Sequence, residues 1–483
     1  MYESPNSGPV FSTEVCVLGA GPAGAATALR LAQLGHRVLI VERAPPGRPH
    51  VGESLPPSVL PMLEALGLRE QVEDAEFLRT RGAVVQWHDR SPVPVPVPMP
   101  ALGDRDGEAG FQVDRARFDA LLLDAAQAAG VRVLRASAGA PIADGARWRV
   151  PLQGGGAVRA SVAIDARGRR AGVADGPRTA ALYAYWEGPR AADSRTRVES
   201  CASSWCWGAP LPDGRVNAAV FLDARRCAAL PPGGRAALYM ALLDTSPLLR
   251  SLLGGRRAGA VHACDATPRA VADAAPAAGL LRVGEAAFCI DPLSSQGVPA
   301  ALRSAVQAAV CVHTALERPT DADLAWRFHR EQVERSSRRH ARLAAQFHAL
   351  AARRHEDPFW ARRAALAGAA PARDPDSKPD SEPAMRPWPQ LDQRLVLDAQ
   401  ARWCRMPAME GEWVTARHAL QHPSLDAPIA FLAEQPVADW ISPLQAAPRL
   451  RDLLDLWHQR FGEARTAAIW PWLWRRALVA PAA

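Results

Sequence analysis

The 483-residue sequence predicts an α/β fold, α+β over the whole chain, with an inserted antiparallel sheet and a small C-terminal domain. Three observations predict it. Residues 14–43 read as a strand, a glycine-rich turn, a helix and a second strand, which is the order of a βαβ unit. Strand-like alternation dominates residues 178–222. A stretch at 369–389, rich in Pro, Asp and Ser and without periodicity, then separates the tail from the rest.

The βαβ unit carries a dinucleotide-binding fingerprint. Gly19 allows the tight turn after the first strand, Gly21 lets the backbone approach a pyrophosphate, and Gly24 lets the helix pack against the strand. The helix N-terminus can then hold phosphates. Glu42 ends the second strand, at the spacing where a carboxylate meets the ribose of an unphosphorylated adenosine half. A glycine turn with a purely structural role is the alternative, and the position of Glu42 at the expected spacing favours dinucleotide binding.

The segments between this unit and residue 177 alternate helix and strand. A helix is expected at 59–66, and the alternating prolines at 93–100 suit only an edge strand or an extended segment. Asp114 is a candidate N-cap for a further helix. Strands at 131–135 and 147–165 follow. The segments up to residue 177 therefore extend the first domain.

The second half of the chain returns to that domain and then leaves it. The expected elements are a helix at 235–253, a strand at 279–290, a helix from 291 to about 316, a long helix or helical hairpin at 321–355, and in the tail strands at 413–417 and 429–432 and a helix at 450–461. The expected domains are a discontinuous dinucleotide-binding domain at 1–177 and 255–320, a substrate-binding antiparallel sheet at 178–254, a helical segment at 321–368, a linker at 369–389 and a small C-terminal domain at 390–483.

Composition argues against several classes of protein. The eight cysteines form no C-x-x-C pair and no metal-ligand spacing with histidine, so reduced thiols and no metal site are expected. The polar N-terminus lacks a signal sequence and no apolar stretch approaches a membrane span, so a cytoplasmic protein without membrane contact is expected. The net charge is +7, but abundant Arg, Ala and Pro fit a GC-rich genome better than nucleic-acid binding. Lys378 is the only lysine.

Four motifs read together resemble the FAD-dependent aromatic hydroxylases, the group A flavoprotein monooxygenases, over residues 10–320. They are the glycine motif with Glu42-Arg43, Gly52-Glu53-Ser54, Asp165-Ala-Arg-Gly168 and Gly284-Glu-Ala-Ala-x-x-x-Asp291-Pro. The resemblance implies a Rossmann-like domain of the aromatic-hydroxylase type that binds FAD. NADH or NADPH, or an external reductant, and O2 would be co-substrates, since no second G-x-G-x-x-G indicates a separate nicotinamide domain.

The same resemblance assigns roles to single residues. Asp291 would bind the ribityl chain or inner phosphate, and the N–H groups of Gly297 and Val298 would face the flavin edge that gains charge on reduction. The full set of expected FAD-binding residues is Gly19, Gly21, Ala23, Gly24, Glu42, Arg43, Gly52, Glu53, Ser54, Gln112, Arg115, Asp165, Gly168, Gly284, Asp291, Pro292, Gly297 and Val298.

Within that superfamily the chain is most similar to the flavin-dependent halogenase branch. Residues 52–58, the Trp205-Cys-Trp207-Gly-Ala-Pro segment and residues 291–297 follow the motifs of that branch. Two departures argue against halogenation. The halogenase lysine would fall near residues 77–82, where the sequence has Arg79 and Arg81, and arginine cannot supply a neutral amine. The glutamate of tryptophan halogenases would align with Ser294.

The 291–297 segment together with the tail at 409–431 resembles the QhpG and LodB type of flavoprotein, which acts in tryptophylquinone cofactor biogenesis. The resemblance implies hydroxylation of a tryptophan side chain on a partner polypeptide, the precursor subunit of a quinoprotein amine dehydrogenase or oxidase. A flavin C4a-hydroperoxide would supply electrophilic oxygen to the electron-rich indole. Two alternatives stay open: a small-molecule hydroxylase or halogenase, and a flavin-binding maturation factor without turnover.

Candidates for catalysis and substrate contact are fewer. His50, Glu53, Ser295 and Gln296 are the candidate catalytic residues, with an exposed loop histidine as the alternative for His50. Trp205 and Trp207 share one face of a strand and serve either as core or as a substrate platform. Two further sets have open roles. The arginines between 327 and 354 form a solvated helix face or a dock for an acidic partner, and Trp470, Trp472 and Trp474 form a small core or an interface.

Overall fold

The computed structural model describes residues 8–45, 50–80, 82–87, 93–95, 109–169, 176–187, 193–270, 273–367, 387–425 and 427–482. The chain divides into two compact units, residues 1–370 and 371–483. Most of the expected linker at 369–389, including Lys378, lies outside the described residues. No helix in the described ranges is both long enough and apolar enough to cross a membrane.

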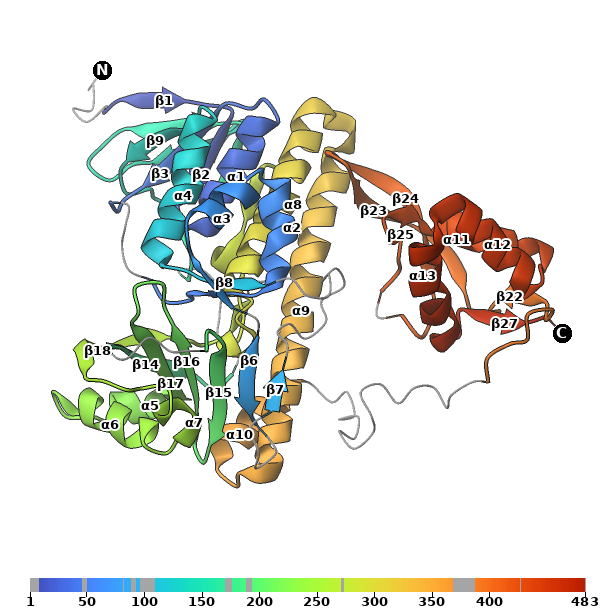
Figure 1. Cartoon of the computed structure of the whole chain (residues 1–483). Coiled ribbons are helices and arrows are strands. Elements are labelled where there is room, and N and C mark those ends of the chain that lie inside the picture. Colours follow the sequence, from blue (N-terminus) through green and yellow to red (C-terminus); the bar gives the residue numbers. More distant parts are fainter. Residues whose placement is uncertain are drawn as a thin grey trace, which may run out of the picture. The chain divides into compact units, whose positions relative to one another are not determined.

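A parallel five-stranded sheet forms the centre of the first unit, as the βαβ pattern predicts (Figure 1). Its strand order is β20 (Leu280–Arg282), β13 (Val162–Asp165), β2 (Val15–Leu18), β3 (Val38–Glu42) and β9 (Arg132–Arg135). Every described pair in it is parallel, and β2 is fully buried. Apolar runs of this kind suit strands that are covered on both faces. The α/β prediction is therefore confirmed.

Helix α1 (Pro22–Gln33) packs against β2 and β3 of this sheet, and α4 (Arg115–Ala128) and α8 (Gly297–Glu317) pack against α1. The Asp114 side chain caps α4 by accepting a hydrogen bond from the Arg117 N–H (3.0 Å), as predicted. A four-stranded sheet lies at the edge of the domain, with β1 (Val10–Ser12), β12 (Ala157–Ala160), β11 (Arg147–Pro151) and β10 (Ile142–Asp144) in that order.

The mixed seven-stranded sheet is larger than the predicted insertion at 178–254. It contains β18 (Arg257–Asp265), β14 (Thr179–Trp186), β17 (Val216–Asp223), β16 (Ser204–Pro210), β15 (Thr196–Cys201), β6 (Ala83–Gln86) and β7 (Val93–Val95) in that order. The prediction missed β6 because it pairs in parallel with β15 from far along the chain. The proline-containing β7 takes an edge, as expected. One face packs against α6 (Gly234–Leu243) and α7 (Pro247–Arg250), and the other carries Trp205 and Trp207.

Two predicted elements differ from the structure. The helix expected at 235–253 is divided into α6 and α7, since Pro247 cannot donate a backbone hydrogen bond and starts a new helix. The strand expected at 279–290 is β20, a short helical turn at Gly284–Ala286 and β21 (Phe288–Cys289). Here Gly284 has φ 57°, which ends the strand.

The segment at 321–355 forms the single helix α9 (Ala322–Arg354) rather than a hairpin, and α10 (Pro358–Ala364) follows it. Figure 1 shows α9 running alongside α8, and the two helices are in contact. A three-stranded sheet contains β4 (Ser54–Leu55), β8 (Gly110–Gln112) and β5 (Leu78–Thr80) in that order. Along the chain its strands lie between strands of the five-stranded sheet, β3 and β9, and strands of the seven-stranded sheet, β6 and β7.

The second unit has its own core. Its elements are β22 (Leu395–Leu397), β23 (Arg402–Glu410), β24 (Trp413–Gln421), β25 (Phe431–Leu432), β26 (Gln435–Pro436), α11 (Val437–Ile441), α12 (Leu450–Phe461), α13 (Glu463–Arg475) and β27 (Val479–Pro481). Trp470 and Trp474 are buried in this core and Trp472 packs against it, so the core alternative for the tail tryptophans is correct.

Candidate active site

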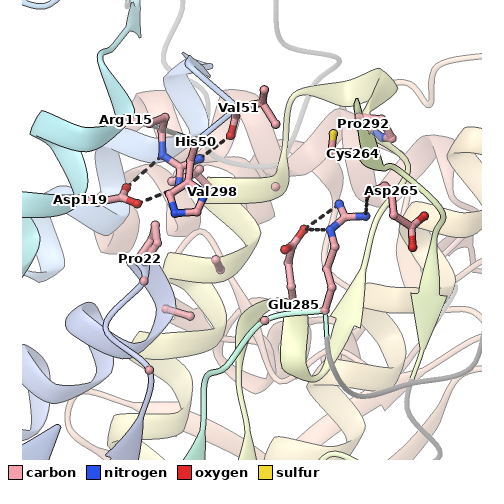
Figure 2. A pocket seen from close by; sticks show the side chains of 18 of the residues that line it. Pro22, His50, Val51, Arg115, Asp119, Cys264, Asp265, Glu285, Pro292 and Val298 are labelled. Carbon is pink, nitrogen blue, oxygen red and sulfur yellow. Dashed lines mark hydrogen bonds and ion pairs between the residues drawn. The ribbon is translucent and has the colours of Figure 1, made fainter. Parts of the chain in front are cut away.

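A cavity of about 630 Å³ opens where the carboxyl ends of β2, β3 and β13 meet α1 and α8 (Figure 2). In open parallel sheets ligands bind at this edge. Residues from the glycine turn, from the 50–54 loop and from the tryptophan-bearing face of the seven-stranded sheet all line it. The cavity therefore joins the two sheets that the sequence analysis assigned to cofactor and substrate.

The three glycines of the first turn have the geometry that the fingerprint requires. Gly19 has φ +105°, and a Cβ there would lie 2.7 Å from the Ala166 carbonyl oxygen. A Cβ on Gly24 would lie 2.0 Å from the Gly19 carbonyl oxygen. A Cβ on Gly21 would meet no atom within 4 Å. The open side of the turn therefore faces the cavity, beside an α1 N-terminus that no side chain caps.

Glu42 is held at the edge of this cavity by its neighbours. Its carboxylate accepts hydrogen bonds from the Ala20 N–H and the Ala44 N–H, each at 2.8 Å. Arg43 is exposed and also lines the cavity. A fixed carboxylate at this place suits the ribose hydroxyls of an adenosine.

Arg115 fixes the loop that carries the Gly-Glu-Ser motif. Its guanidinium donates to both carboxylate oxygens of Asp119, each at 3.0 Å, and to the Val51 carbonyl oxygen at 2.8 Å. A Cβ on Gly52 would lie 3.0 Å from the Arg115 guanidinium, so the loop passes directly over it. Figure 2 shows His50 beside this arginine at the cavity wall.

Glu53 is the buried acid of the cavity, with only 3% of its surface exposed. Its carboxyl accepts hydrogen bonds from the Tyr185 hydroxyl (3.0 Å), the Asn217 amide (2.9 Å) and the Gly52 N–H (2.9 Å). Burial raises the pKa of Glu53 despite these donors. Tyr185 and Asn217 belong to β14 and β17, so the acid ties the loop to the seven-stranded sheet.

Two arginines that follow Asp165 form ion pairs at the edge of the first cavity. Arg167 makes a bidentate pair with Asp165, at 2.9 and 2.7 Å, and lines the cavity while Asp165 does not. Arg169 donates to Glu285 (2.9 and 3.1 Å) and to the Asp265 carbonyl oxygen (2.6 Å). Asp165 therefore positions Arg167, and the guanidinium presents the charge to the cavity.

The Asp291 segment leads into α8. One Asp291 oxygen accepts from the Leu293 N–H (3.1 Å) and the other lies 3.0 Å from His348 Nε2. Ser295 then adopts a left-handed conformation, φ 51°, before the N-terminus of the 21-residue α8, which no side chain caps. The N–H groups of Gly297 and Val298 begin this helix at the cavity wall. His348 lies on α9, far along the chain and in no motif, so no sequence signal marked it.

A second cavity of about 450 Å³ adjoins the first, and Ser54 and Ser295 line both. Val85, Trp87 and Val198 form part of its apolar wall, and Phe347 of α9 completes it. Gln296 lines this second cavity and accepts a hydrogen bond from the Ser58 hydroxyl (3.0 Å). The candidate Gln296 therefore does not reach the first cavity.

Most of the predicted site residues meet at the first cavity. Those that line it are Gly19, Gly21, Ala23, Glu42, Arg43, His50, Gly52, Glu53, Ser54, Arg115, Gly168, Trp207, Pro292, Ser295, Gly297 and Val298. Asp291 and Gln296 line the second cavity. Gly24, Gln112, Asp165, Trp205 and Gly284 line neither cavity.

Three of the residues that line neither cavity, Trp205, Gln112 and Gly284, have structural roles. The Trp205 ring stacks on Phe221, with ring centroids 3.7 Å apart, so Trp205 is core rather than a substrate platform. Gln112 is fully buried and its amide donates to Ser54 at 3.4 Å, so it supports the motif from behind. A Cβ on Gly284 would lie 2.6 Å from the Ala23 side chain, which explains the glycine.

These features define an FAD-dependent oxidoreductase. The glycine turn, the fixed Glu42 and the two helix N-termini fit the adenosine, pyrophosphate and isoalloxazine parts of FAD along one cavity. An FAD-binding domain family model matches residues 12–171, and a tryptophan halogenase family model matches residues 99–373. The chain therefore belongs to the tryptophan halogenase family.

Individual proteins of the family resemble the chain to different extents. The tryptophan 2-halogenase of Chondromyces crocatus is 28% identical over 379 residues, covering 72% of this chain and 70% of that protein. The peptidyl tryptophan dihydroxylase QhpG, essential for tryptophylquinone cofactor biogenesis, is 29% identical, with a TM-score of 0.68 over 97% of this chain and 100% of that one. The halogenase CmlS shares the fold, with a TM-score of 0.79, 21% identity and 97% and 96% coverage.

Proposed function

We propose that this enzyme hydroxylates an aromatic ring, and that the ring is a tryptophan side chain of a partner polypeptide in tryptophylquinone biogenesis. The observation that carries the proposal is the similarity to QhpG, which at 29% identity spans 97% of this chain and so includes the second unit. The halogenase CmlS spans the same share of the chain, but at 21% identity.

The position expected for the halogenase lysine supports hydroxylation. Arg79 makes an ion pair with Glu73 at 3.1 Å, lies over the Phe111 ring and lines neither cavity. Arg81 lies outside the described residues. No lysine is among the residues that line the two cavities, and Lys378 is the only one in the sequence. A guanidinium stays protonated, so neither arginine replaces the amine that accepts an activated halogen.

The proposed reaction balances with dioxygen and a nicotinamide as co-substrates. One oxygen atom replaces a ring hydrogen as a hydroxyl group and the other leaves as water. NADH or NADPH gives up two electrons and, with one proton from solvent, completes the stoichiometry. Bound FAD supplies the electron transfer and the electrophilic oxygen. An indole is electron-rich and needs little further activation.

The chain's own residues bind, orient and hold charge in this scheme. The N–H groups at the start of α8 stabilise negative charge at the flavin edge. Burial raises the pKa of Glu53, and this carboxyl lies at the wall of the first cavity, where Tyr185 and Asn217 hold it in place. The apolar wall of the second cavity excludes water from the aromatic ring, and Ser54 and Ser295 lie at the junction with the first cavity.

Mass spectrometry of the candidate precursor polypeptide tests the proposal. The FAD-loaded enzyme is incubated with NADH or NADPH, oxygen and the precursor, both unmodified and already cross-linked, with free tryptophan in a parallel reaction. A gain of one or two oxygen atoms localised to a tryptophan of the polypeptide supports the assignment. An unchanged polypeptide beside modified free tryptophan would instead favour the small-molecule alternative, to which the halogenase names of most relatives point.

A further inference from the structure

We propose that the second cavity binds an extended, acidic segment of the polypeptide, with its aromatic target in the apolar part of the cavity and its carboxylates on arginines of α9. The inference rests on the proposed function and names what the substrate segment must carry. It is argued from the shape of the cavity, the arrangement of charge along α9 and the pairing of its arginines.

The cavity is elongated along α9. The α9 residues that line it recur every three or four positions from Gln332 to Phe347, so they lie on one face of the helix. At 1.5 Å per residue this face is about 22 Å long. An extended peptide rises about 3.3 Å per residue, so about six or seven residues match that length. A single free aromatic molecule would leave most of such a groove empty.

The polarity of the groove changes along this face. Leu343 and Phe347 border the apolar part with Trp87, and Phe347 belongs to the same packed cluster as Leu293 beside the flavin-site loop. Toward the N-terminus of α9 the wall carries Arg335 and Arg339. The aromatic ring therefore fits the end nearest the first cavity, and the rest of a bound segment extends past the arginines.

Arginines of α8 and α9 bring positive charge to this second part of the cavity. Arg335 and Arg339 are both exposed and form no ion pair with any described carboxylate. Arg303 of α8 lines the same wall. Asp291 is the one carboxylate among the described lining residues, and it already bonds to His348. The lining therefore favours an anionic ligand.

Two arginines of α9 that do not line the cavity are paired with glutamates of the same helix. Arg327 lies 3.8 Å from Glu331 and Arg338 pairs with Glu334, and neither arginine lines the cavity. The same positive charge acts on His340, because burial together with the charges of Arg339 and Arg303 lowers the pKa of this histidine to about 4. If this face of α9 were only solvated, we would not expect the arginines without an ion pair to lie on the cavity side and the paired ones to lie away from it.

Peptide binding to the FAD-loaded enzyme tests the proposal without requiring turnover. The probes are two heptapeptides with one tryptophan followed by either glutamates or glutamines, and a third with phosphoserine. Binding is followed by calorimetry at low and at physiological salt. We expect the glutamate peptide to bind about fivefold more tightly than the glutamine peptide, in proportion to two exposed ion pairs, and the difference to shrink with salt.

Matched variants locate the effect. The double variant Arg335→Gln/Arg339→Gln should abolish the preference for glutamate, whereas Arg327→Gln/Arg338→Gln removes the same charge from the same helix and should retain it. Equal loss in both variants, no preference in the wild type, or a preference confined to phosphoserine would overturn the proposal. Selective binding of the glutamate peptide by an enzyme that adds no oxygen to any tryptophan polypeptide would refute the proposed function and leave the charge selectivity established.

Discussion

His348→Ala tests whether α9 holds the flavin-site loop in place. The His348 and Asp291 side chains are 2% and 8% exposed, and they meet at 3.0 Å. Removing the imidazole leaves a buried carboxylate with the Leu293 N–H as its remaining hydrogen-bond donor among the described residues. Removing one partner of a buried pair of this kind costs about 3 kcal/mol, and at about 2.1 cal/mol/K of unfolding entropy per residue this lowers the Tm of the first unit, residues 1–370, by about 4 °C. Thermal and urea unfolding of the FAD-loaded enzyme measure the loss.

Two companion variants separate this hydrogen bond from simple loss of packing. His348→Gln can place an amide N–H near the Asp291 oxygen and should recover part of the stability. His340→Ala removes the same ring from the same helix, at a site where the described residues offer it no hydrogen bond, and should cost about 1 kcal/mol. A His348→Ala enzyme no less stable than His340→Ala would refute the role given to this pair.

Three further predictions follow from the geometry. Glu42→Ala should weaken FAD binding to the apoprotein about tenfold to a hundredfold, measured by fluorescence titration, while Glu187→Ala at an exposed ion pair should leave it unchanged. Because burial raises the pKa of Glu53, the folded state keeps a proton that the unfolded state releases, and the free energy of unfolding should fall as pH rises from 4.5 to the folded pKa. Glu53→Gln should remove this contribution to the pH dependence, measured by urea titrations at several pH values. An identical slope in both proteins would contradict this. Trp205→Ala should cost about 3–5 kcal/mol of stability, whereas Trp207→Phe should act on turnover rather than on unfolding, and the reverse pattern would contradict the placement of Trp205 in the core.

Local pattern was enough to predict the cofactor half of the site. Gly19, Gly21, Gly24 and Glu42 act through the backbone of one continuous βαβ unit, so their spacing along the chain determines their positions in space. The Gly-Glu-Ser loop was identified in the same way, and Glu53 lines the cavity. Motif recognition succeeded where one segment builds the whole feature.

Features assembled from distant segments could not be read from the sequence. The parallel pairing of β6 with β15 brings residues 83–86 beside residues 196–199, and no local pattern encodes it. The partner of Asp291 is His348, which lies on a helix whose surface pattern does not distinguish it. Trp205 and Trp207 lie two residues apart, so the sequence assigns both to the same face of a strand. Only the packing shows that Trp205 stacks on Phe221 whereas Trp207 lines the cavity.

The arginines of α9 illustrate the same limit in electrostatics. The sequence shows many arginines between residues 327 and 354 but not which of them lack counter-charges. Helix geometry pairs Arg338 with Glu334 one turn away and leaves Arg335 and Arg339 toward the second cavity. A solvated face and a binding wall therefore coexist on one helix.

The central claim is oxygen transfer to an aromatic ring rather than halogenation. The most direct measurement is the mass of the product formed from the tryptophan-containing precursor with FAD, NADH or NADPH, isotopically heavy dioxygen and excess bromide. The account predicts one heavy oxygen atom for each hydroxyl group on tryptophan and no bromine. Bromine in the product, or oxygen that comes from water instead of dioxygen, would contradict it.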